Sequence, residues 1–451
     1  MKNYNKGFIY FICIVSAMGG LLFGYDWVVI GGAKIFYEQF FQITNDPNMQ
    51  GLAMSIALAG CLLGALTAGG LADGYGRKPL LVVSALIFLI SAYGTGAYDD
   101  FVLFLIARFI GGIAIGIASG LSPMYIAEIS PAEIRGKLVS LNQLAIVVGI
   151  LVAQVVNWLL AGDNQEWNLQ MGWRWMFWAE AFPALLFLIL ALIIPESPRW
   201  LAMNGKEKKA GAIFERIGGG EYAANELKAI LHAPQSEKEG GLSTLFSKPF
   251  RLVLMIGIII AVFQQWCGTN VIFNYAQEIF QGAGYDVDNT FINIVVTGIA
   301  NLIFTFVAIY TVDKLGRRAL MLIGAGGLGI IYLLLGACYY FQVSGIFMVI
   351  LVVLAIACYA MSLGPVTWVL LSEIFPGKVR GVAVATATFA LWMGSFTLTY
   401  SFPFLNKGLG TYGTFWIYTL ICACGFVYFY RTLPETKGKS LEELENKLIK
   451  K

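Results

Sequence analysis

Apolar runs of about 20 residues recur along the whole chain, and about 20 residues is what a helix needs to cross roughly 30 Å of hydrocarbon. The chain has 451 residues, of which 58% are hydrophobic and only 13% are charged. A soluble domain of this size could not bury so much apolar surface. The runs predict twelve transmembrane helices, at approximately 8–30, 51–72, 79–97, 101–126, 138–160, 174–194, 251–278, 290–312, 319–341, 345–371, 382–404 and 413–433.

The runs are more typical of helices than of the strands of a membrane barrel. Barrel strands are shorter and alternate in polarity, whereas these runs are long and continuously apolar. The first run follows Lys2 and Lys6, as the core of a signal peptide would, but it is too long, contains Asp26 and lacks a clear cleavage site. The predicted fold class is therefore an all-α polytopic membrane protein.

The basic residues predict how the chain is oriented, because basic loops stay on the cytoplasmic side. With the N-terminus inside, all but four of the 30 Lys and Arg residues fall in cytoplasmic segments or at the cytoplasmic ends of spans. Lys34, Arg174 and Lys407 fall in outer segments, and Arg108 lies within a span. We therefore expect an inner or plasma membrane protein with both termini in the cytoplasm. No basic groove or motif indicates nucleic acid as a partner.

The nucleophilic and metal-binding residue types are few and scattered. The seven cysteines lie in apolar runs without the spacing of metal ligands, which is typical of small packing residues. The one histidine, His232, lies in a central polar loop. No nucleophile–base pair or cofactor loop is visible, so we expect no enzymatic activity, no cofactor and no metal.

Three loop signatures occur in the first half of the chain and recur in the same order in the second half. Repeats of six helices with one orientation are related by an axis along the membrane normal, as in transporters whose site lies between the halves, although a channel could also be built this way. The paired signatures are Asp73–Lys78 with Asp313–Arg318, Glu128–Gly136 with Glu373–Gly381, and Pro195–Arg199 with Pro434–Gly438.

The same pattern predicts four segments. Residues 1–196 form an N-terminal six-helix half, and residues 249–438 form a C-terminal one. Residues 197–248 are rich in Lys, Glu and Gly and predict a cytoplasmic linker with short amphipathic helices such as 205–217 and 221–232. A last cytoplasmic helix is expected in 439–451.

Three ionisable residues, Asp26, Arg108 and Glu180, lie in or at the edge of predicted spans. An unpaired charge there costs at least about 2.5–3.5 kcal/mol, so these residues must pair or titrate. One interpretation is a fixed salt bridge that holds helices together. The other is a proton site, because an aspartate beside an arginine has a low pKa that desolvation raises once the partner is lost.

A second polar group in the spans is neutral. Carboxamides both donate and accept hydrogen bonds, which suits hydroxyl groups that do the same, although they can also link helices at about 0.6 kcal/mol per bond. Residues 264, 265 and 270 cannot share one side of a regular helix, but Gly268 permits a local break. Trp368 and Trp392 lie within predicted spans and offer apolar faces on which a ring-shaped ligand can stack. The carboxamides are Gln143, Gln264, Gln265, Asn270, Asn274 and Asn301.

Together with the paired loops, several short motifs resemble those of the sugar porter family of the major facilitator superfamily, over nearly the whole chain. The residues 361–365 and 368–376 look most similar to those of bacterial proton/xylose symporters. The motifs are Gly24-Tyr25-Asp26, Gly76-Arg77-Lys78, Pro123–Glu128, Pro195–Arg199, Gln264-Gln265, Gly364–Trp368 and Pro434–Gly438.

The resemblance implies the major facilitator fold, with two six-helix halves and cytoplasmic linker helices. It implies a proton-coupled symporter for a monosaccharide, either xylose or a hexose, that works by alternating access as a monomer in the lipid bilayer. An uncoupled sugar facilitator is the nearest alternative. A sugar-binding nutrient sensor is a third, weakened by the short cytoplasmic tail.

By the same resemblance, Asp26 and Arg108 match the proton-coupling pair of the symporters, and Glu180 matches a further carboxylate. Tyr275 matches a gating aromatic residue. Leu391 stands where the xylose symporters have glutamine, which leaves the preferred monosaccharide open. The expected substrate-binding residues are Gln143, Gln264, Gln265, Asn270, Asn301, Gly364, Trp368 and Trp392.

Opposite charges recur at the helix ends that are predicted to face the cytoplasm. A solvated loop pair contributes only about 0–1 kcal/mol. Their repetition in both halves nevertheless predicts an intracellular charge latch that holds the outward-facing state and separates when the protein opens inward. Its expected members are Asp73, Arg77, Glu128, Arg135, Asp313, Arg317, Glu373 and Arg380, with Glu196, Arg199 and Glu435 added by the resemblance.

Overall fold

The computed structural model describes residues 4–162, 164–232, 242–376 and 379–437, without the side chains of residues 242, 243, 249 and 313. Within these ranges all regular secondary structure is helical. The chain divides into two compact units. The first comprises Met1–Val29, Ala59–Ala153 and Arg174–Ser236, and the second comprises Ile30–Leu58, Gln154–Trp173 and Glu237–Lys451.

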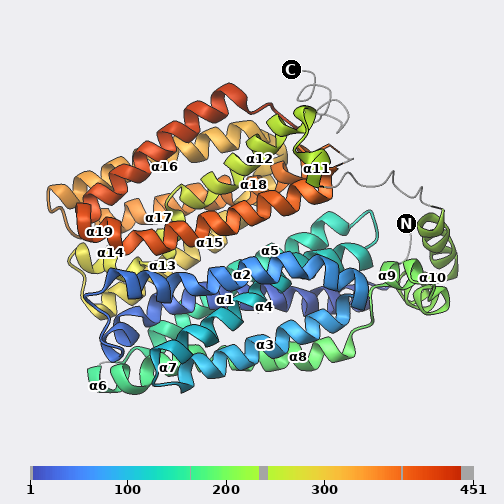
Figure 1. Ribbon diagram of the computed structural model, residues 1–451, viewed down its shortest axis with the longest axis horizontal. Coiled ribbons are helices and arrows are strands. Elements are labelled where there is room, and N and C mark those ends of the chain that lie inside the picture. The colour runs from blue at the N-terminus through green and yellow to red at the C-terminus, as the bar shows by residue number, and fades with distance from the viewer. Residues whose placement is uncertain (1–3, 163, 233–241, 377–378, 438–451) are drawn as a thin grey trace. The chain divides into compact units, whose positions relative to one another are not determined.

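The first half of the sequence forms long membrane-type helices followed by two linker helices (Figure 1). Helices α1, α2 and α5 each continue from one unit into the other. The helices are α1 (Lys6–Phe40), α2 (Pro47–Tyr75), α3 (Arg77–Ala97), α4 (Phe101–Ile129), α5 (Arg135–Leu160), α6 (Gln165–Trp167), the π-helix η1 (Asn168–Gly172), α7 (Trp173–Trp178), α8 (Ala181–Ile193), α9 (Pro198–Met203) and α10 (Glu207–Leu231).

The second half of the sequence forms the remaining helices, drawn from yellow-green to red in Figure 1. Eleven helical segments of the described chain are long and apolar enough to cross a membrane. One of them, α19, has 53 residues and is interrupted at Gly410, whose φ is 69°, so it supplies two spans. The twelve predicted spans are thereby confirmed. The helices are α11 (Leu242–Leu245), α12 (Lys248–Trp266), α13 (Thr269–Asn274), α14 (Ala276–Gly282), α15 (Val287–Leu315), α16 (Arg317–Tyr340), α17 (Ile346–Met361), α18 (Leu363–Glu373) and α19 (Arg380–Thr432).

Glycines allow α1 and α5 to pack with their backbones in contact. A Cβ at Gly24 would lie 1.9 Å from the carbonyl oxygen of Ile146, and a Cβ at Gly149 would lie 2.0 Å from that of Leu21. Small residues at such crossings are how membrane helices associate, because lipid tails supply no hydrophobic force between helices. The crossing fixes the part of α1 that carries Asp26.

Several spans are interrupted where the sequence cannot continue a regular helix. Gly268 has a φ of 91° and separates α12 from α13, which confirms the predicted local break. Ser362 separates α17 from α18. The short gap between α7 and α8 contains Glu180; Pro183, three residues later, has no N–H to donate to the carbonyl of Ala179.

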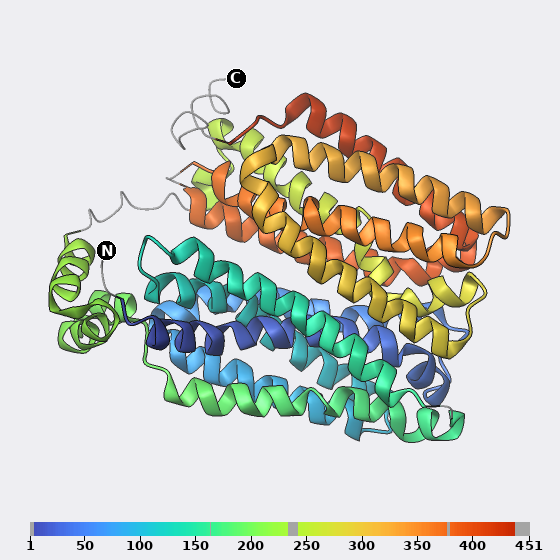
Figure 2. The ribbon, with the colours of Figure 1, turned by 180° about the vertical axis from the view of Figure 1, so that it is seen from behind.

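The linker between the halves is helical where it is described, as predicted, and Figure 2 shows α9 and α10 near the N-terminal end of α1. Helix α10 is interrupted at Gly219, whose φ is 85°, so it corresponds to the two predicted stretches. Its apolar face packs Phe214 and Ile217 against Ile9, Ile126 and Leu138 of the first unit. Residues 233–241 of the linker and the expected helix 439–451 lie outside the described residues.

Helix α1 is longer than predicted. The span was expected to end near residue 30, with Lys34 in an outer segment, but the helix continues to Phe40. At 1.5 Å per residue its 35 residues measure about 52 Å. The predicted helix end was too early because Lys34 and Glu38 lower the local hydropathy, whereas in the structure both charges are paired and buried. The location of Lys34 in an outer segment stays a prediction.

Candidate functional site

A buried ion pair joins α1 to α4 in the first unit. Nη1 of Arg108 donates to Oδ1 of Asp26, and Nη2 lies 3.4 Å from the backbone oxygen of Asp26. The side chains are 3% and 1% exposed. Gly111, one turn beyond Arg108, leaves the room that Asp26 occupies, since a Cβ there would lie 3.0 Å from Oδ2 of Asp26. The structure therefore brings the predicted proton-coupling pair into direct contact.

Glu180 adds a second carboxylate to this pair. It is buried, and its Oε1 has no hydrogen-bond partner among the described residues; the same is true of Oδ2 of Asp26. It is close enough to interact electrostatically with both Asp26 and Arg108. Of the two buried carboxyl groups, Asp26 is bonded to the Arg108 guanidinium and Glu180 lies near it, so the group offers two sites at which a proton could bind.

In the second unit, three of the predicted carboxamides form a continuous hydrogen-bonded chain. Nδ2 of Asn270 donates to Oε1 of Gln265, Nε2 of Gln265 donates to Oε1 of Gln264, and Nε2 of Gln264 lies 2.5 Å from the hydroxyl of Tyr359. The break at Gly268 makes this possible, because it lets a residue on α13 reach back to the end of α12. All three carboxamides are buried.

The other predicted sugar contacts are distributed over four elements. Asn301 on α15 and Trp392 on α19 are buried, whereas Trp368 on α18 is 43% exposed. Gly364, also on α18, lies close to Tyr359: a Cβ there would be 3.3 Å from its Cε1. Gln143 lies half-buried on α5, in the first unit. Leu391, directly before Trp392, is buried as well.

Tyr275, the predicted gating residue, lies between α13 and α14 and is fully buried. Its hydroxyl donates to the backbone oxygen of Thr399 at 2.7 Å. Its ring centroid is 4.1 Å from that of Phe402, at an interplanar angle of 34°. Both contacts are made with α19, so the side chain is fixed on two sides of its ring.

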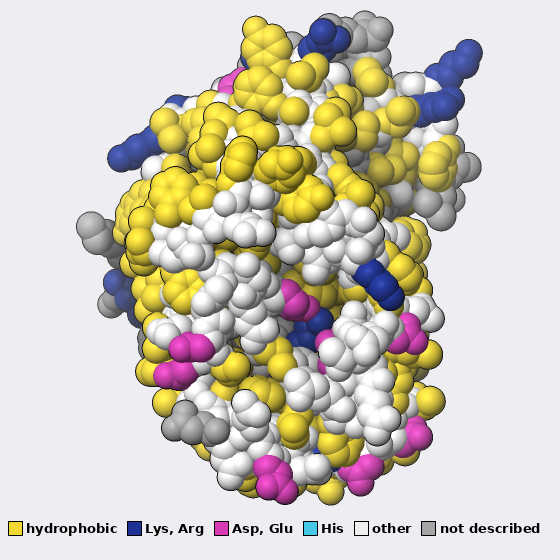
Figure 3. Space-filling model, turned by 90° about the vertical axis from the view of Figure 1, so that its left-hand side faces the viewer, with side chains coloured by type: hydrophobic (Ala, Val, Ile, Leu, Met, Phe, Trp, Pro, Cys, Tyr) yellow, Lys and Arg dark blue, Asp and Glu magenta, His cyan; other side chains and the backbone are white. Residues whose placement is uncertain are grey.

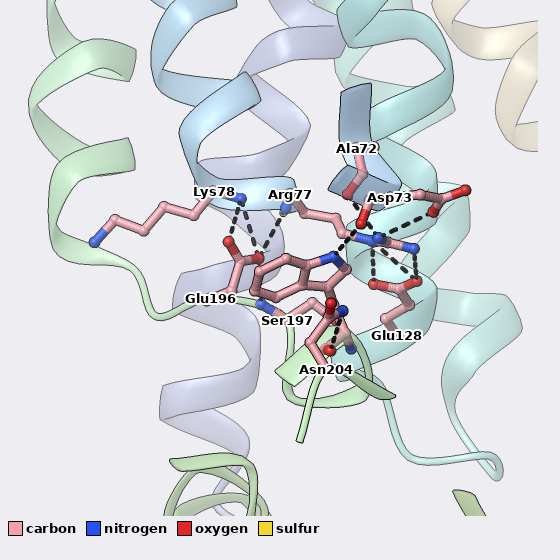
Figure 4. Close-up of polar contacts among 9 residues, drawn as sticks. Ala72, Asp73, Arg77, Lys78, Glu128, Glu196, Ser197 and Asn204 are labelled. Atoms are coloured by element: carbon pink, nitrogen blue, oxygen red, sulfur yellow. Dashed lines mark hydrogen bonds and ion pairs between the residues drawn. The ribbon is translucent and has the colours of Figure 1, made fainter. Parts of the chain in front are cut away.

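The charged loop after α2 forms a compact cluster with the ends of α4 and α8 (Figure 4). Nε of Arg77 is 2.9 Å from Oε2 of Glu128 and Nη2 is 2.8 Å from Oε1, a bidentate geometry. Asp73 is 3.3 Å from Nη1 and is largely exposed. Oε1 of Glu196 accepts the backbone N–H groups of Arg77 at 2.9 Å and of Lys78 at 3.2 Å.

The second half repeats this cluster with equivalent residues. Nη2 of Arg317 is 3.1 Å from Oε1 of Glu373. Glu435 accepts the backbone N–H groups of Arg317 at 2.9 Å and of Arg318 at 3.1 Å, at the N-terminus of α16. In place of the bidentate contact, Thr436 donates its hydroxyl to Oε2 of Glu373 at 2.6 Å.

The Glu435 carboxyl is held ionised by these contacts. Burial by itself raises its pKa, but the backbone N–H groups of Lys437, Arg317, Arg318 and Thr436 together lower the pKa below the ordinary value of 4.5. A carboxylate at the N-terminus of a helix is also favoured by the helix dipole.

The remaining latch residues make different contacts. Arg135 donates to the backbone oxygen of Ser130 at 3.4 Å, and Arg380 makes the equivalent bond to Phe375 at 3.1 Å. Arg199 is exposed on α9. The side chain of Asp313 lies outside those described. The cluster around Arg77 thus lies within the first unit and the cluster around Arg317 within the second. Their equivalent contacts match the internal repeat of the sequence.

Sequence reasoning missed Tyr359, which ends the carboxamide chain. A tyrosine in an apolar run is usually part of the packing, so its type alone gives no signal. Its place just before Ser362 and Gly364, where the span is interrupted, could have drawn attention to it.

Comparisons with known proteins extend over the whole chain. A sequence model of the family described as "Sugar (and other) transporter" matches residues 12–448. The arabinose-proton symporter of Bacillus subtilis (strain 168) is 39% identical over 451 residues, covering 100% of this chain and 97% of that protein. The D-xylose-proton symporter of Escherichia coli (strain K12) is 39% identical over 478 residues, covering 98% and 96%.

A solved structure is similar over the same length. The inward open conformation of the xylose transporter XylE from E. coli superposes with a TM-score of 0.88 at 37% sequence identity, covering 98% of this chain and 100% of that chain. The similarity therefore includes every helix from which the clusters described above are built.

Proposed function

Because the chain belongs to the sugar transporter family, we propose that it is a proton-coupled monosaccharide symporter that works by alternating access. It is a multi-pass inner-membrane transporter and not an enzyme. The observation that carries the proposal is the buried cluster of Asp26, Arg108 and Glu180. The proposal is also supported by two relatives that are similar over nearly their whole length, one named as an arabinose-proton symporter and the other as a D-xylose-proton symporter.

The proton step follows from the charges of this cluster. In the paired state Asp26 accepts a hydrogen bond from Arg108. A proton on Asp26 removes the attraction, and the guanidinium is then free to interact with Glu180. Arg108 thus exchanges Asp26 for Glu180 as its partner. The ion pair that joined α1 to α4 is then broken, so the two helices can move relative to each other. Protonation is thereby linked to a change of conformation.

The sugar step uses the carboxamides. The chain from Asn270 through Gln264 to Tyr359 is preorganised, and each carboxamide can still donate and accept. Sugar hydroxyls, which do the same, can replace or extend these bonds without leaving buried polar groups unsatisfied. Gln143, Asn301 and Gly364 complete the proposed polar contacts. Trp368 and Trp392 supply the apolar surface, and Tyr275 covers the site.

The two loop clusters act as the intracellular latch in this proposal. The distribution of Lys and Arg supports a cytoplasmic location for both termini and the linker. Arg77 with Glu128, and Arg317 with Glu373, hold the ends of three helices in each half, and such contacts must change when that side opens. We propose that the unit of transport is a monomer.

Uptake of radiolabelled sugar by cells that produce the protein tests the proposal. Xylose, arabinose and glucose are offered with and without a pH gradient across the membrane. We expect at least one of them to accumulate above its external concentration, and a protonophore to abolish the accumulation. Equilibration without accumulation at every pH would instead identify an uncoupled facilitator, and the absence of any uptake would contradict sugar transport.

A further inference from the structure

The second unit contains a group of buried charges of its own. Nζ of Lys34, on α1, is 2.7 Å from Oε1 of Glu38, one turn later, and contacts Oε1 of Glu278 on α14. The side chains of Lys34 and Glu38 are 5% and 6% exposed, and that of Glu278 is 29% exposed. No step of the proposed transport mechanism uses these three residues.

The arrangement places Lys34 between two helices. Figure 3 shows the end of the molecule that carries α6 and α14, where Lys or Arg and Asp or Glu side chains lie together in a hollow. Glu38 accepts a further bond from Nε2 of Gln50 at 3.1 Å, so it is held on the side of α2. Glu278 lies on α14 and contacts Lys34 from that helix. The bond between Lys34 and Glu278 therefore joins α1 to α14.

The same segment of α1 is held against α13 and α14 by neutral contacts. Gln277 donates through Nε2 to the backbone oxygen of Gly32 at 2.7 Å, and its Oε1 accepts from the backbone N–H of Ile35 at 3.3 Å. A Cβ at Gly31 would lie 2.9 Å from the backbone oxygen of Asn274. The two backbones thus meet directly, and the ion pair lies one turn farther along α1.

Lys34 also contacts the predicted gating residue. Its Nζ is 5.4 Å from the centroid of the Tyr275 ring, within the range of a cation–π interaction. Tyr275 is thereby contacted by α1 through Lys34 and by α19 through Thr399 and Phe402. The cation that joins α1 to α14 is the same one that lies over this ring.

The geometry points to Lys34 and Glu278 as an outer clamp that holds the segment of Tyr275 closed. Lys34 is a positioning residue: its ammonium neutralises Glu278 across the helix boundary while it lies over the Tyr275 ring. The attraction between Lys34 and Glu278 is strong while water is excluded from the pair, and this favours the closed state. When α14 moves away from α1, water solvates both charges and the attraction is lost. The inference rests on the proposed function in one respect, the gating role of Tyr275.

Two carboxylates in the cluster allow a matched test, because Glu278→Gln and Glu38→Gln remove the same charge by the same chemical change. Glu278→Gln breaks the ion pair between α1 and α14, keeps the bonds of Gln277 to α1, and leaves the pair of Lys34 and Glu38 within α1. Glu38→Gln leaves the ion pair between α1 and α14 intact. The reporter is Thr399→Cys, at a buried residue that bonds to Tyr275 through its backbone oxygen, which the substitution keeps. Its reaction with a membrane-impermeant maleimide is timed on intact cells and on inverted vesicles, with the native cysteines as background.

We expect Glu278→Gln to raise the labelling rate on intact cells about threefold or more, a change typical of the loss of one ion pair, and Glu38→Gln to leave it unchanged. Labelling of inverted vesicles should not rise. Equal rates for wild type and both variants would overturn the clamp, as would equal acceleration by both. A pair with only a structural role would lower thermal stability without changing the labelling rate.

The charge-swapped variant Lys34→Glu/Glu278→Lys keeps the test decisive if Glu278→Gln does not fold. It retains one cation and two anions, whereas Lys34→Glu alone leaves three anions. The clamp is supported if the charge-swapped variant is labelled at the wild-type rate while Lys34→Glu alone is labelled rapidly or misfolds. A swap no better than the single variant overturns it. Because labelling requires neither sugar nor proton gradient, its outcome is independent of whether the protein accumulates a sugar.

Discussion

Asp26 is the residue on which proton coupling depends in this account. In the variant Asp26→Asn the amide can still hydrogen-bond to Arg108, but it cannot exchange a proton. We expect sugar binding and counterflow to be retained, and accumulation against a gradient to be lost. Equilibrium binding and gradient-driven uptake, measured on the same preparation, separate the two. If Asp26→Asn still concentrates sugar in response to a pH gradient, the proton is carried elsewhere.

The carboxamide chain predicts a cost in affinity when it is cut. Gln264→Ala and Asn270→Ala each leave buried hydroxyls of the sugar without partners, which weakens binding by about 1–3 kcal/mol. Gln264→Ala should cost more, because it also removes the partners of Gln265 and Tyr359. Calorimetric titration measures both, with Cys424→Ala, at an exposed cysteine, as a control for handling. Binding isotherms that match the wild type for both variants would move the sugar site away from α12 and α13.

Leu391 predicts a change of selectivity and not of coupling. An apolar wall discriminates between substrates by only about 1–3 kcal/mol, whereas a hydrogen-bonding side chain discriminates strongly against a missing hydroxyl. Leu391→Gln is therefore expected to alter the ranking of pentoses against hexoses and to leave the pH dependence of uptake as it is. Competition among xylose, glucose and galactose measures the ranking. An unchanged ranking would remove Leu391 from the wall of the site.

At this scale, residue type and position were enough to single out Asp26, Arg108 and Glu180, because a charge in an apolar run is expensive. The carboxamides were found for the same reason. The contacts of a residue could not be predicted in the same way. Nothing about a tyrosine or a lysine at these positions indicates that Tyr359 ends the carboxamide chain or that Lys34 lies over Tyr275, and only the fold shows it.

The helix ends carry a prediction of their own, through the carboxylate that caps α16. Glu435→Gln should lower the free energy of unfolding by about 0.5–2 kcal/mol, as the loss of a helix cap does. Glu196→Gln, at the residue that caps the N-terminus of α3 in the same way, is the matched variant. Melting curves of the purified proteins at neutral pH give the comparison, and no loss of stability in either variant would contradict the capping role.

The pH dependence of that stabilisation has a definite sign. The pKa of Glu435 is lowered in the folded protein, so its contribution is fully present above the ordinary value of 4.5 and is lost as the pH falls through the lower folded pKa. Between pH 5 and 8 the group does not titrate. We therefore expect Glu435→Gln to leave the shape of the pH profile of uptake unchanged in that range, and a shifted profile would give the latch a share in proton coupling.

At the scale of helices, the spans could be predicted from the length of the apolar runs, and the break at residue 268 from the presence of glycine there. The interruptions at Glu180 and Ser362 could not, because the hydropathy of the run is continuous through both. The end of α1 was missed for the opposite reason. Two charges interrupt the apolar pattern there, but each neutralises the other within one helical turn, so the helix does not have to end.

For the molecule as a whole, the internal repeat was the most informative signal. It predicted equivalent loops, and the structure gives them equivalent bonds: Glu196 and Glu435 cap α3 and α16 in the same way, and Arg77 and Arg317 contact Glu128 and Glu373. What a repeat cannot supply is the difference between the halves. The ionisable cluster occurs in the first unit and the carboxamide chain in the second, and that division is the basis of the proposed coupling of proton to sugar.

Proton movement driven by sugar is the most direct test of that coupling. Purified protein is reconstituted into vesicles that contain a pH-sensitive dye, with no pH gradient imposed, and sugar is added outside. The account predicts acidification of the lumen with wild-type protein, which starts with sugar entry and saturates with sugar concentration. Asp26→Asn vesicles should bind the sugar and show no pH change. Sugar entry without proton movement in the wild type, or an equal pH change with Asp26→Asn, would contradict it.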